Sequence, residues 1–366
     1  MSRRILSFVL LLSITSIALA QESPAFKRAQ HLKHGINLSM WFAQSSDYSP
    51  ARLRTFTTLA DVDRIAKMGF DHARISIDPK VFCYDYPWTN CEAVRILDDV
   101  VARALSKNVA VIIDLHPTSE YKKSIATSDD ATERFAQLWA RIAQHFANFD
   151  PDKLFFEILN EPEASDAYRW TGMQLHAAEA IRRVAPNHTL IVAGTRYSDI
   201  ENLILLPEFA DRNLIYNFHY YSPHTFTHQG ASWGSAYWVG LHDLPFPSSR
   251  QWPADQGATT SEARWELLQY KLGHWDAERV NAEIGFAADW ARKHHVPLTC
   301  NEFGVYRDHT NPADRAAWIT TVREALEKNN IGWTMWDYSG GFGVVTVKNG
   351  VVTEDPETLK ALGLAH

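Results

Sequence analysis

Two segments of this chain end an apolar run on the pair Asn-Glu. One reads Phe155-Phe156-Glu157-Ile158-Leu159-Asn160-Glu161-Pro162, and the other reads Pro297-Leu298-Thr299-Cys300-Asn301-Glu302-Phe303-Gly304. Each resembles a short buried strand that is followed by a residue able to break or turn the chain. A carboxylate at such a position costs desolvation free energy unless it has partners. We therefore expect Glu161 and Glu302 to be functional.

Two carboxyl groups that face each other are suited to glycoside hydrolysis. One protonates the leaving oxygen, and the other attacks the anomeric carbon or activates a water molecule. A separation of about 5–5.5 Å predicts a covalent intermediate and retained configuration, whereas a separation near 8 Å predicts inversion. We expect the shorter separation for Glu161 and Glu302, with Glu302 held ionised by a cation such as Arg74.

Other reactive side chains lie at or near the ends of apolar runs. They are Arg74, His116, His219, Tyr221 and Trp336. Taken singly, a histidine or tryptophan in such a place is more typical of a structural residue. Their repeated placement at strand ends indicates that a cation, two imidazoles, a phenol and an indole surround the two acids.

Short apolar runs alternate with helical patterns along the chain, which is typical of parallel β/α units. We predict a single-domain α/β protein, a (β/α)8 TIM barrel, whose active site forms at the carboxyl ends of the strands. The alternative is an open doubly wound sheet, but no G-x-G-x-x-G motif follows the first strand. The predicted strands cover residues Gly35–Trp41, His72–Ile77, Val109–His116, Leu154–Asn160, Leu190–Gly194, Leu214–Tyr220, Leu298–Glu302 and Gly332–Trp336.

Helix signals fall between these strands. One helix starts near Thr58 and stops at Gly69, and two more begin at Asn311-Pro312 and Asp355-Pro356. Further helices are expected over residues 94–105, 131–146 and 168–184. The longest irregular stretch runs from about Ser222 to Gly273, and we expect it to form a folded lid or cleft wall. It contains Trp233, Trp238, Trp252 and Trp265.

Composition narrows the class of function. The 366 residues carry 36 basic and 43 acidic side chains, a net charge of −7. This balance argues against a nucleic-acid-binding surface. The chain also contains 13 Trp and 13 Tyr, whose flat rings suit a hydroxyl-rich ligand. We predict no cofactor and no metal, and a monomer whose partner is a β-linked polysaccharide or oligosaccharide.

The first twenty residues predict export. Arg3 and Arg4 precede an apolar run, and Ala18-Leu19-Ala20 matches a small-x-small cleavage site. We interpret residues 1–20 as a signal peptide and residues 21–366 as the catalytic domain, secreted to the periplasm or the medium. No later segment has the apolar length of a membrane helix.

Cysteine usage leaves one question open. In an oxidising compartment Cys83 and Cys91 could pair across a short loop. The sequence does not give the Cα separation that a disulfide requires. Cys300 lies in an apolar strand pattern, and we expect a buried thiol.

Three competing interpretations are weaker. Gly230-Ala231-Ser232-Trp233-Gly234 matches the G-x-S-x-G motif of esterases, which requires a strand before it and a helix after it. His224 and His228 are spaced like metal ligands, but they lie in a segment that we expect to be an irregular, solvated loop. A non-catalytic glycan-binding barrel would not need the two glutamates.

The ordered set of motifs resembles glycoside hydrolase family 5, the cellulase family A of retaining barrel enzymes. The matching segments are Gly35-Ile36-Asn37-Leu38, Ala73-Arg74-Ile75-Ser76, Asp114-Leu115-His116, Leu159-Asn160-Glu161-Pro162, His219-Tyr220-Tyr221, Asn301-Glu302-Phe303-Gly304 and Trp336. The resemblance implies that Glu161 is the general acid/base and Glu302 the nucleophile. It also implies that substrate is bound by Asn37, Arg74, His116, Asn160, His219, Tyr221 and Trp336.

The resemblance does not fix the substrate, but a row of aromatic rings suits a linear β-linked polymer, and we predict an endo-β-1,4-glucanase that acts on cellulose-like or mixed-linkage glucan. The same family contains β-mannanases and xyloglucanases, which remain alternatives. The Trp-rich stretch after the sixth strand is longer than the simplest members need, and this leaves the shape of the leaving-group side open.

Overall fold

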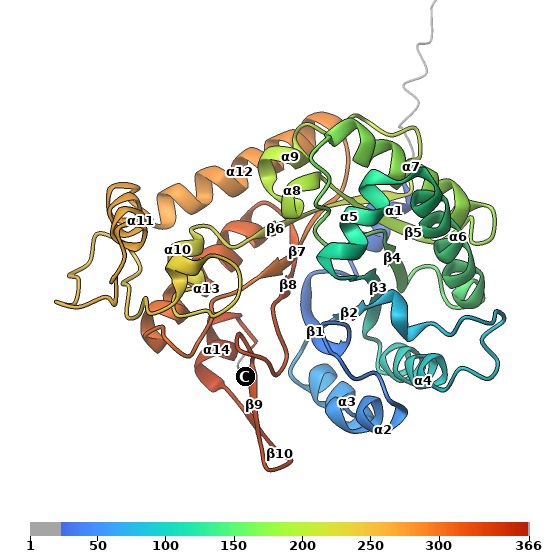
Figure 1. Cartoon of the computed structure of the whole chain (residues 1–366), viewed down its shortest axis with the longest axis horizontal. Helices are drawn as coiled ribbons and strands as arrows, with labels where there is room; N and C mark the ends of the chain where they lie inside the picture. The colour runs from blue at the N-terminus through green and yellow to red at the C-terminus, as the bar shows by residue number, and fades with distance from the viewer. Residues whose placement is uncertain (1–22, 365–366) are drawn as a thin grey trace, which may run out of the picture.

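The computed structural model describes residues 23–364, and the predicted signal peptide lies outside them. Eight parallel strands follow one another in chain order and close into a barrel, because β8 pairs with β1 (Figure 1). This closure confirms the predicted TIM barrel and excludes the open sheet. The strands are β1 (His34–Phe42), β2 (His72–Ile77), β3 (Ala110–Leu115), β4 (Leu154–Glu157), β5 (Thr189–Ala193), β6 (Leu214–Tyr220), β7 (Leu298–Phe303) and β8 (Gly332–Met335).

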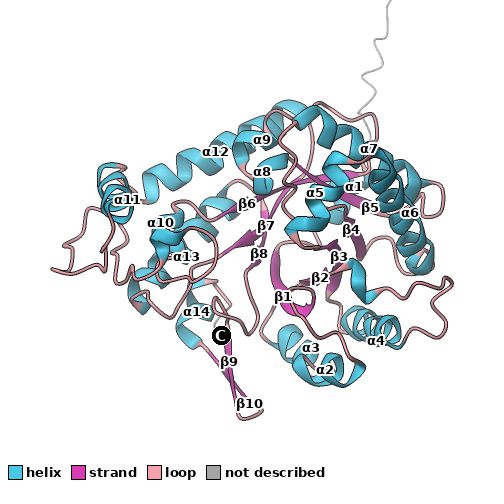
Figure 2. Cartoon of the chain, in the orientation of Figure 1, coloured by secondary structure: helices cyan, strands magenta, loops and turns pink. Residues whose placement is uncertain are grey.

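Helices surround the barrel (Figure 2). They are α1 (Pro24–Ala29), α2 (Pro50–Phe56), α3 (Leu59–Lys67), α4 (Glu92–Ser106), α5 (Ser119–Thr127), α6 (Asp129–Phe146), α7 (Ala167–Arg182), α8 (Thr195–Ser198), α9 (Ile200–Leu203), α10 (His224–Thr227), α11 (Ser261–Leu272), α12 (Ala277–His294), α13 (Pro312–Lys328) and α14 (Pro356–Ala361). Two 3₁₀ turns, η1 (Pro79–Val81) and η2 (Ala236–Trp238), and a hairpin of β9 (Val345–Lys348) with β10 (Val351–Glu354) complete the described chain.

Local sequence signals set the helix ends. The Thr58 hydroxyl and the Asp61 carboxylate form a reciprocal capping box at the start of α3, and Gly69 follows that helix with a φ of 93°. Asn311 and Asp355 cap α13 and α14, each with proline at the first helical position. These predicted boundaries are confirmed.

The barrel interior changes from apolar to polar along β3, β4 and β6. Ala25 of α1, Ile112, Phe155, Ile191 and Ile215 form a buried cluster inside the barrel. Because side chains on one face of a strand recur every second residue, the residues that follow them on the same face lie closer to the carboxyl ends. These include Asp114, Glu157 and Asn217, all buried. The alternation therefore places charged groups above an apolar floor.

Three expectations about the elements need correction. Arg74 lies in the middle of β2, not at its end. β4 ends at Glu157, so that Asn160 and Glu161 follow the strand. The stretch 222–273 contains α10, η2 and α11, and is not irregular throughout. Helix α11 lacked a one-sided pattern because apolar residues lie on its exposed face (Trp265, Leu268) as well as on its buried face (Leu267, Tyr270).

Cys83 and Cys91 form a disulfide in the loop between β2 and α4, with a Cα–Cα distance of 5.7 Å. This answers the question that the sequence left open. Cys300 is a free, buried thiol, as expected.

Candidate active site

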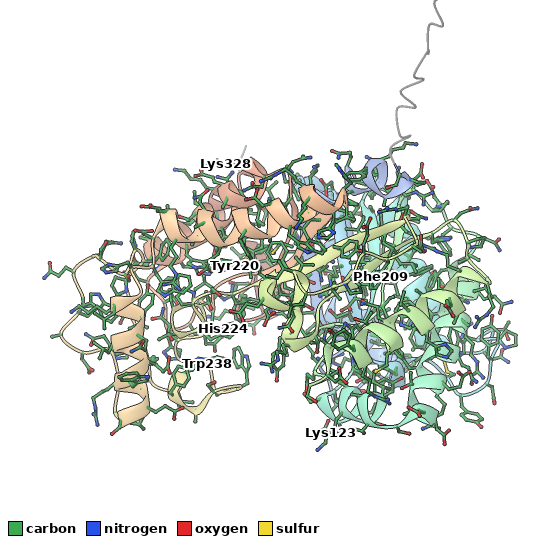
Figure 3. The ribbon with its side chains drawn as sticks, turned by 90° about the horizontal axis from the view of Figure 1, so that it is seen from above. Lys123, Phe209, Tyr220, His224, Trp238 and Lys328 are labelled. Carbon is green, nitrogen blue, oxygen red and sulfur yellow. A yellow bond between two sulfur atoms is a disulfide. The ribbon has the colours of Figure 1, made fainter. Side chains whose placement is uncertain are left out.

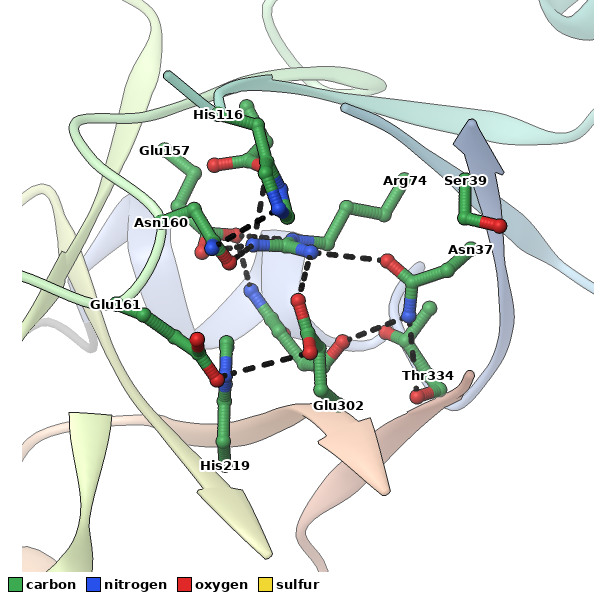
Figure 4. Close-up of polar contacts among 12 residues, drawn as sticks. Asn37, Ser39, Arg74, His116, Glu157, Asn160, Glu161, His219, Glu302 and Thr334 are labelled. Atoms are coloured by element: carbon green, nitrogen blue, oxygen red, sulfur yellow. Dashed lines mark hydrogen bonds and ion pairs between the residues drawn. The ribbon is translucent and has the colours of Figure 1, made fainter. Parts of the chain in front are cut away.

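A fully buried arginine organises the polar centre of the barrel (Figure 4). Arg74 binds Glu157 through Nε and Nη2, at 2.9 and 2.8 Å. Its Nη1 donates to Asn37 Oδ1 and Glu302 Oε1, at 2.9 and 2.7 Å. Its Nη2 also donates to Asn160 Oδ1 at 2.9 Å and lies 3.0 Å from Asp114 Oδ2. All the donor nitrogens of the guanidinium are therefore in use.

Burial and charge oppose each other at Arg74. Burial alone would lower the pKa of the guanidinium, but the carboxylates of Asp114, Glu157 and Glu302 raise it well above its ordinary value. The arginine therefore keeps its charge. Burial raises the pKa of Asp114 to about 6, although Arg74 opposes this shift.

Glu302 is held at a fixed position at the end of β7. Its Oε1 accepts from Arg74 at 2.7 Å, and its Oε2 accepts from the Tyr221 hydroxyl at 3.0 Å. The side chain is 5% exposed. Burial raises the pKa of Tyr221 well above its usual value, so this phenol remains a hydrogen-bond donor.

An irregularity in β7 brings two consecutive side chains into the barrel. The pairing register shifts between Phe218 and His219 on the β6 side, and between Cys300 and Phe303 on the β8 side. Asn301 Nδ2 reaches Glu157 at 2.6 Å, while the next residue, Glu302, reaches Arg74. Regular alternation would send one of the two outward. Bulges that redirect a side chain in this way are common beside active sites.

Glu161 reaches the same centre from the loop after β4. Its φ of 43° is left-handed, a conformation that non-glycine residues adopt mainly where the surroundings require it. Its Oε1 lies 3.1 Å from His219 Nδ1, which is also 3.6 Å from Glu302 Oε2. Ligand atoms of Glu161, His219 and Glu302 all lie within 4.8 Å of one another. The Glu161 side chain is 26% exposed, far more than that of Glu302.

The two site histidines are neutral. Burial lowers the pKa of His116 to about 3 and that of His219 to about 4. His116 Nδ1 contacts Asp114 Oδ2 at 3.0 Å, and Asn160 Nδ2 lies 3.1 Å from His116 Nε2. Because the amide nitrogen can only donate, His116 carries its proton on Nδ1. The Trp336 ring stacks on His116 with a centroid distance of 5.8 Å.

These groups lie at the base of a cleft of about 1560 Å³. The predicted site residues that line it are His116, Glu161, His219, Tyr221, Glu302 and Trp336. The other three, Asn37, Arg74 and Asn160, lie beneath the lining, where they are buried and hold the residues above them. The structure thus brings all nine predicted residues into one network, in two layers.

Sequence reasoning missed several members of the lower layer. Asp114, Glu157, Asn217 and Asn301 bind Arg74 or one another, and none was assigned a role. The sequence could have indicated two of these residues. Asp114 precedes His116 by two residues, and Asn217 precedes His219 by two, so each lies on the same face of its strand as the predicted histidine.

The stretch after β6 forms one wall of the cleft, as predicted. Trp233 and Trp238 line it, whereas Trp252 and Trp265 do not. His224 and His228 also line it, and their rings stack on Trp238 with centroid distances of 6.1 and 4.7 Å. Figure 3 shows His224 and Trp238 together on this side of the molecule. The expectation of a solvated histidine pair was wrong for His228, which is buried by this packing.

The esterase alternative loses its structural support. Ser232 lies between α10 and η2, with no strand before it and no α-helix directly after it, so the nucleophile elbow of esterases is not formed. The ligand atoms of Glu161, His219 and Glu302 are also close enough together to hold a metal ion, and the Glu302 carboxyl group is already paired with the Arg74 guanidinium.

Comparison with known proteins agrees with this geometry. Residues 33–341 match the family model described as Cellulase (glycosyl hydrolase family 5). The chain is 29% identical over 363 residues to Endoglucanase 3 of Fibrobacter succinogenes, covering 92% of this chain and 53% of that protein. It is 27% identical to Endoglucanase C of Acetivibrio thermocellus, covering 84% and 91% of the two chains.

Solved structures give the same result. Endoglucanase Cel5A from the hyperthermophile Thermotoga maritima superposes with a TM-score of 0.73 at 27% identity, covering 93% of this chain and 99% of that one. Cel5A structures with cellobiose and with mannotriose have TM-scores of 0.73 and 0.72. Since the family match covers most of the sequence, this chain belongs to glycosyl hydrolase family 5.

Proposed function

We propose that this glycoside hydrolase is a retaining endo-β-1,4-glucanase in which Glu302 is the nucleophile and Glu161 the general acid/base. The observation that carries the proposal is the approach of the two carboxyl groups, which have oxygen atoms within 4.8 Å of each other and share His219. Such a short separation favours direct attack by a carboxylate and leaves no room for the water molecule that an inverting enzyme places there.

The first step follows from the partners of each glutamate. Arg74 and Tyr221 hold Glu302 as a carboxylate aimed at the anomeric carbon. Glu161, the more exposed acid, donates its proton to the leaving oxygen as the glycosidic bond breaks and the bond from Glu302 to the sugar forms. Neutral His219 lies between the two groups and adds no charge to the centre.

The second step reverses the roles. Formation of the glycosyl ester removes the charge of Glu302, and Glu161, now ionised, takes a proton from an entering water molecule. That water attacks the anomeric carbon from the side that the leaving group vacated, and Glu302 is released as a carboxylate. Two inversions at one carbon retain its configuration.

The cleft supports a polymeric substrate. Its volume of about 1560 Å³ exceeds the roughly 300–1,000 Å³ of typical small-ligand pockets. Trp233, Trp238 and Trp336 offer ring faces along it, to which the C–H faces of equatorial sugars can pack. The names of the relatives favour β-1,4-glucan. Mannan and xyloglucan are the alternatives, and the structure of Thermotoga maritima Cel5A in complex with mannotriose supports keeping mannan in the test.

Export remains part of the proposal. Residues 1–20 have the pattern of a cleavable signal peptide, and we infer secretion and action as a monomer outside the cytoplasm. Within residues 23–364, no helix combines the length and the apolar character needed to cross a membrane. Mass spectrometry of the secreted protein tests the inference by locating its N-terminus, which we expect at Gln21.

The decisive test is Glu302→Gln. We expect turnover of carboxymethylcellulose to fall at least about a thousandfold, because the amide cannot form the glycosyl ester. The unfolding temperature and the affinity for cellotetraose should stay close to those of the unchanged enzyme. Substantial residual turnover would remove Glu302 from the nucleophile role.

The substrate is tested by product analysis on carboxymethylcellulose, mixed-linkage glucan, xyloglucan and glucomannan. We expect short β-1,4-linked gluco-oligosaccharides with retained anomeric configuration at early times. Cleavage of glucomannan alone would replace glucan by mannan as substrate, and inverted products would reject the double displacement.

A further inference from the structure

The proposed acid/base is held by fewer contacts than the proposed nucleophile. Two donors, Arg74 and Tyr221, fix the carboxylate of Glu302. The Glu161 side chain has one hydrogen-bond partner in the described part of the chain, His219 Nδ1 at 3.1 Å. A general acid must come within hydrogen-bond reach of the oxygen that it protonates. The position of the Glu161 carboxyl group therefore depends on the loop after β4 that carries it.

This loop has little backbone support of its own. Among the described residues, the N–H groups of Glu161, Glu163 and Ala164 donate to no backbone oxygen. Pro162 has no N–H group. A cavity of about 300 Å³ lies between the loop, α5 and α7. Packed side chains do not support the loop on that side, so contacts elsewhere must hold it.

Side chains from two neighbouring elements hold the loop. On one side, Thr195 Oγ1 at the start of α8 donates to Ala164 O at 2.5 Å. On the other side, Lys122 of α5 places its Nζ 3.2 Å from Glu163 Oε1. Ser119 Oγ donates to the same oxygen at 2.8 Å. Glu163 therefore ties the loop to α5 through an ion pair and a hydrogen bond.

Lys122 occupies an inward position of its helix. Lys122 and Ile125 are the buried residues of α5, and the Lys122 side chain is 6% exposed. The next residue, Lys123, is exposed, as lysines usually are. Burial of an ammonium group costs free energy unless a carboxylate compensates it, whereas an apolar side chain could be buried here without this cost. A residue that breaks the local packing rule in this way indicates a functional constraint.

The charge of Lys122 is also felt in the polar centre of the barrel. Burial raises the pKa of Asp114 to about 6, and the charges of Arg74 and Lys122 oppose this rise. Burial lowers the pKa of His116 to about 3, and the same two cations act in the same direction. Lys122 thus lies close to the catalytic centre as well as to the loop, although it does not line the cleft.

We propose that Lys122 is a positioning residue that, through its ion pair with Glu163, holds Glu161 within reach of the leaving oxygen. The ring of Pro162 fixes the backbone angle φ between the two glutamates, so a shift of Glu163 is passed on to Glu161. The inference rests on the proposed function, because it takes Glu161 as the general acid. A misplacement of about 1 Å can lower a rate about a hundredfold.

The variant Lys122→Met tests the positioning role, with Lys123→Met as the matched control. Methionine keeps a long, flexible chain and removes the charge. The readout is kcat/KM for two aryl β-cellobiosides, one with phenol and one with dinitrophenol as leaving group. Phenol needs the proton of the acid in order to leave, whereas dinitrophenolate leaves as a stable anion without it. We expect Lys122→Met to lower kcat/KM about tenfold for the phenyl substrate and by less than about twofold for the dinitrophenyl substrate. The control should change neither.

The partner in the ion pair provides a second variant. Glu163→Gln keeps the shape of the side chain, removes its charge and should give the same selective loss. If the two residues act as one pair, the double variant should lose no more than the more affected single variant. Thermal unfolding shows whether each variant is folded, and if Lys122→Met does not fold, Glu163→Gln decides alone.

The outcomes separate this inference from the proposed function. A loss of equal size on both substrates would reject the inference, because it reports general damage. A selective loss in Lys122→Met that Glu163→Gln does not share would also reject it, because the charge would then act on Asp114 and not through the loop. If no variant changes kcat/KM for either substrate, the positioning role is wrong and the catalytic assignment stands. If the unchanged enzyme hydrolyses neither substrate, the proposed function is wrong, and the inference is wrong with it.

Discussion

At the scale of single residues, the site depends on one cation among carboxylates. Arg74 is within 3.0 Å of oxygen atoms of Asp114, Glu157 and Glu302, and all four side chains are buried. Breaking such a cluster leaves charges without partners, which costs far more than the cluster contributes when intact. Arg74 is therefore needed for folding as well as for the position of the Glu302 side chain.

The variant Arg74→Met tests this dependence. We expect the free energy of unfolding at pH 7 to fall by about 3–5 kcal/mol, because the carboxylates lose their counter-charge. Chemical denaturation at pH 7 and pH 5 measures it. The loss should be smaller at pH 5, where the carboxyl groups can take up protons. An equal loss at both pH values would show that lost packing, not charge, is the cause.

A histidine away from the cleft predicts acid sensitivity. Burial lowers the pKa of His188 to about 4, and the nearby charges of Arg28 and Arg182 act in the same direction. Between pH 6.5 and about 4 the unfolded chain binds a proton at this position and the folded chain does not. The stability contributed by neutral His188 is therefore complete above pH 6.5 and is lost progressively as the pH falls from 6.5 to about 4.

The variant His188→Gln should remove the part of the pH dependence of stability that arises from this histidine. Lowering the pH from 7 to 4.5 should destabilise the unchanged protein by up to about 3 kcal/mol more than the variant, measured by denaturant unfolding at each pH. His176→Gln, at a surface histidine, is the control. Identical pH dependence in all three proteins would reject the assignment.

At the scale of elements, irregular backbone positions the reactive groups. The bulge of β7 turns Asn301 and Glu302 to the same side, and the left-handed residue Glu161 redirects the chain after β4. The disulfide between Cys83 and Cys91 is also a local feature, because it closes a short loop before α4. Regular strands and helices form the scaffold, and Glu161 and Glu302 lie near or just beyond the ends of two of the strands.

Removing the disulfide by the double change Cys83→Ser and Cys91→Ser should lower the free energy of unfolding by about 2–3 kcal/mol, because the unfolded loop regains conformational entropy. Denaturant unfolding measures this loss, and the reduced, unchanged protein should match the variant. Unaltered stability would mean that the bond does not restrict the unfolded chain.

At the scale of the whole molecule, stability depends on closing the barrel between β8 and β1. A Cβ atom on Gly332 would lie 1.6 Å from the backbone oxygen of Leu32, just before β1. Backbone at a strand junction cannot move aside without disturbing the register of both strands. The glycine is required by this close approach, not by its φ angle.

Gly332→Ala should therefore destabilise the protein by about 1–3 kcal/mol or more through overpacking. Gly172→Ala and Gly285→Ala are matched controls in α7 and α12, where an added Cβ meets nothing within 4 Å. These two should be neutral or stabilising by up to about 1 kcal/mol. Thermal unfolding measures the stability of the three variants. Equal unfolding temperatures would show that the close approach of Gly332 to Leu32 is not needed for stability.

The sequence alone predicted the regular architecture and the two glutamates that we propose to react. Alternating apolar runs, helix caps at Thr58, Asn311 and Asp355, and two strand-end glutamates are local features, and local features are set by short-range sterics and hydrogen bonding. The family resemblance added the roles expected of the residues around the two acids. Helix α11 was missed because its apolar residues have no single face.

Only the tertiary structure decided how these residues work together. The convergence of Asp114, Glu157 and Glu302 on Arg74 joins strands far apart in the chain, so no local pattern reports it. A sequence records which side chains a strand can present on one face, whereas burial, distance and charge balance arise only when the strands close around a shared interior.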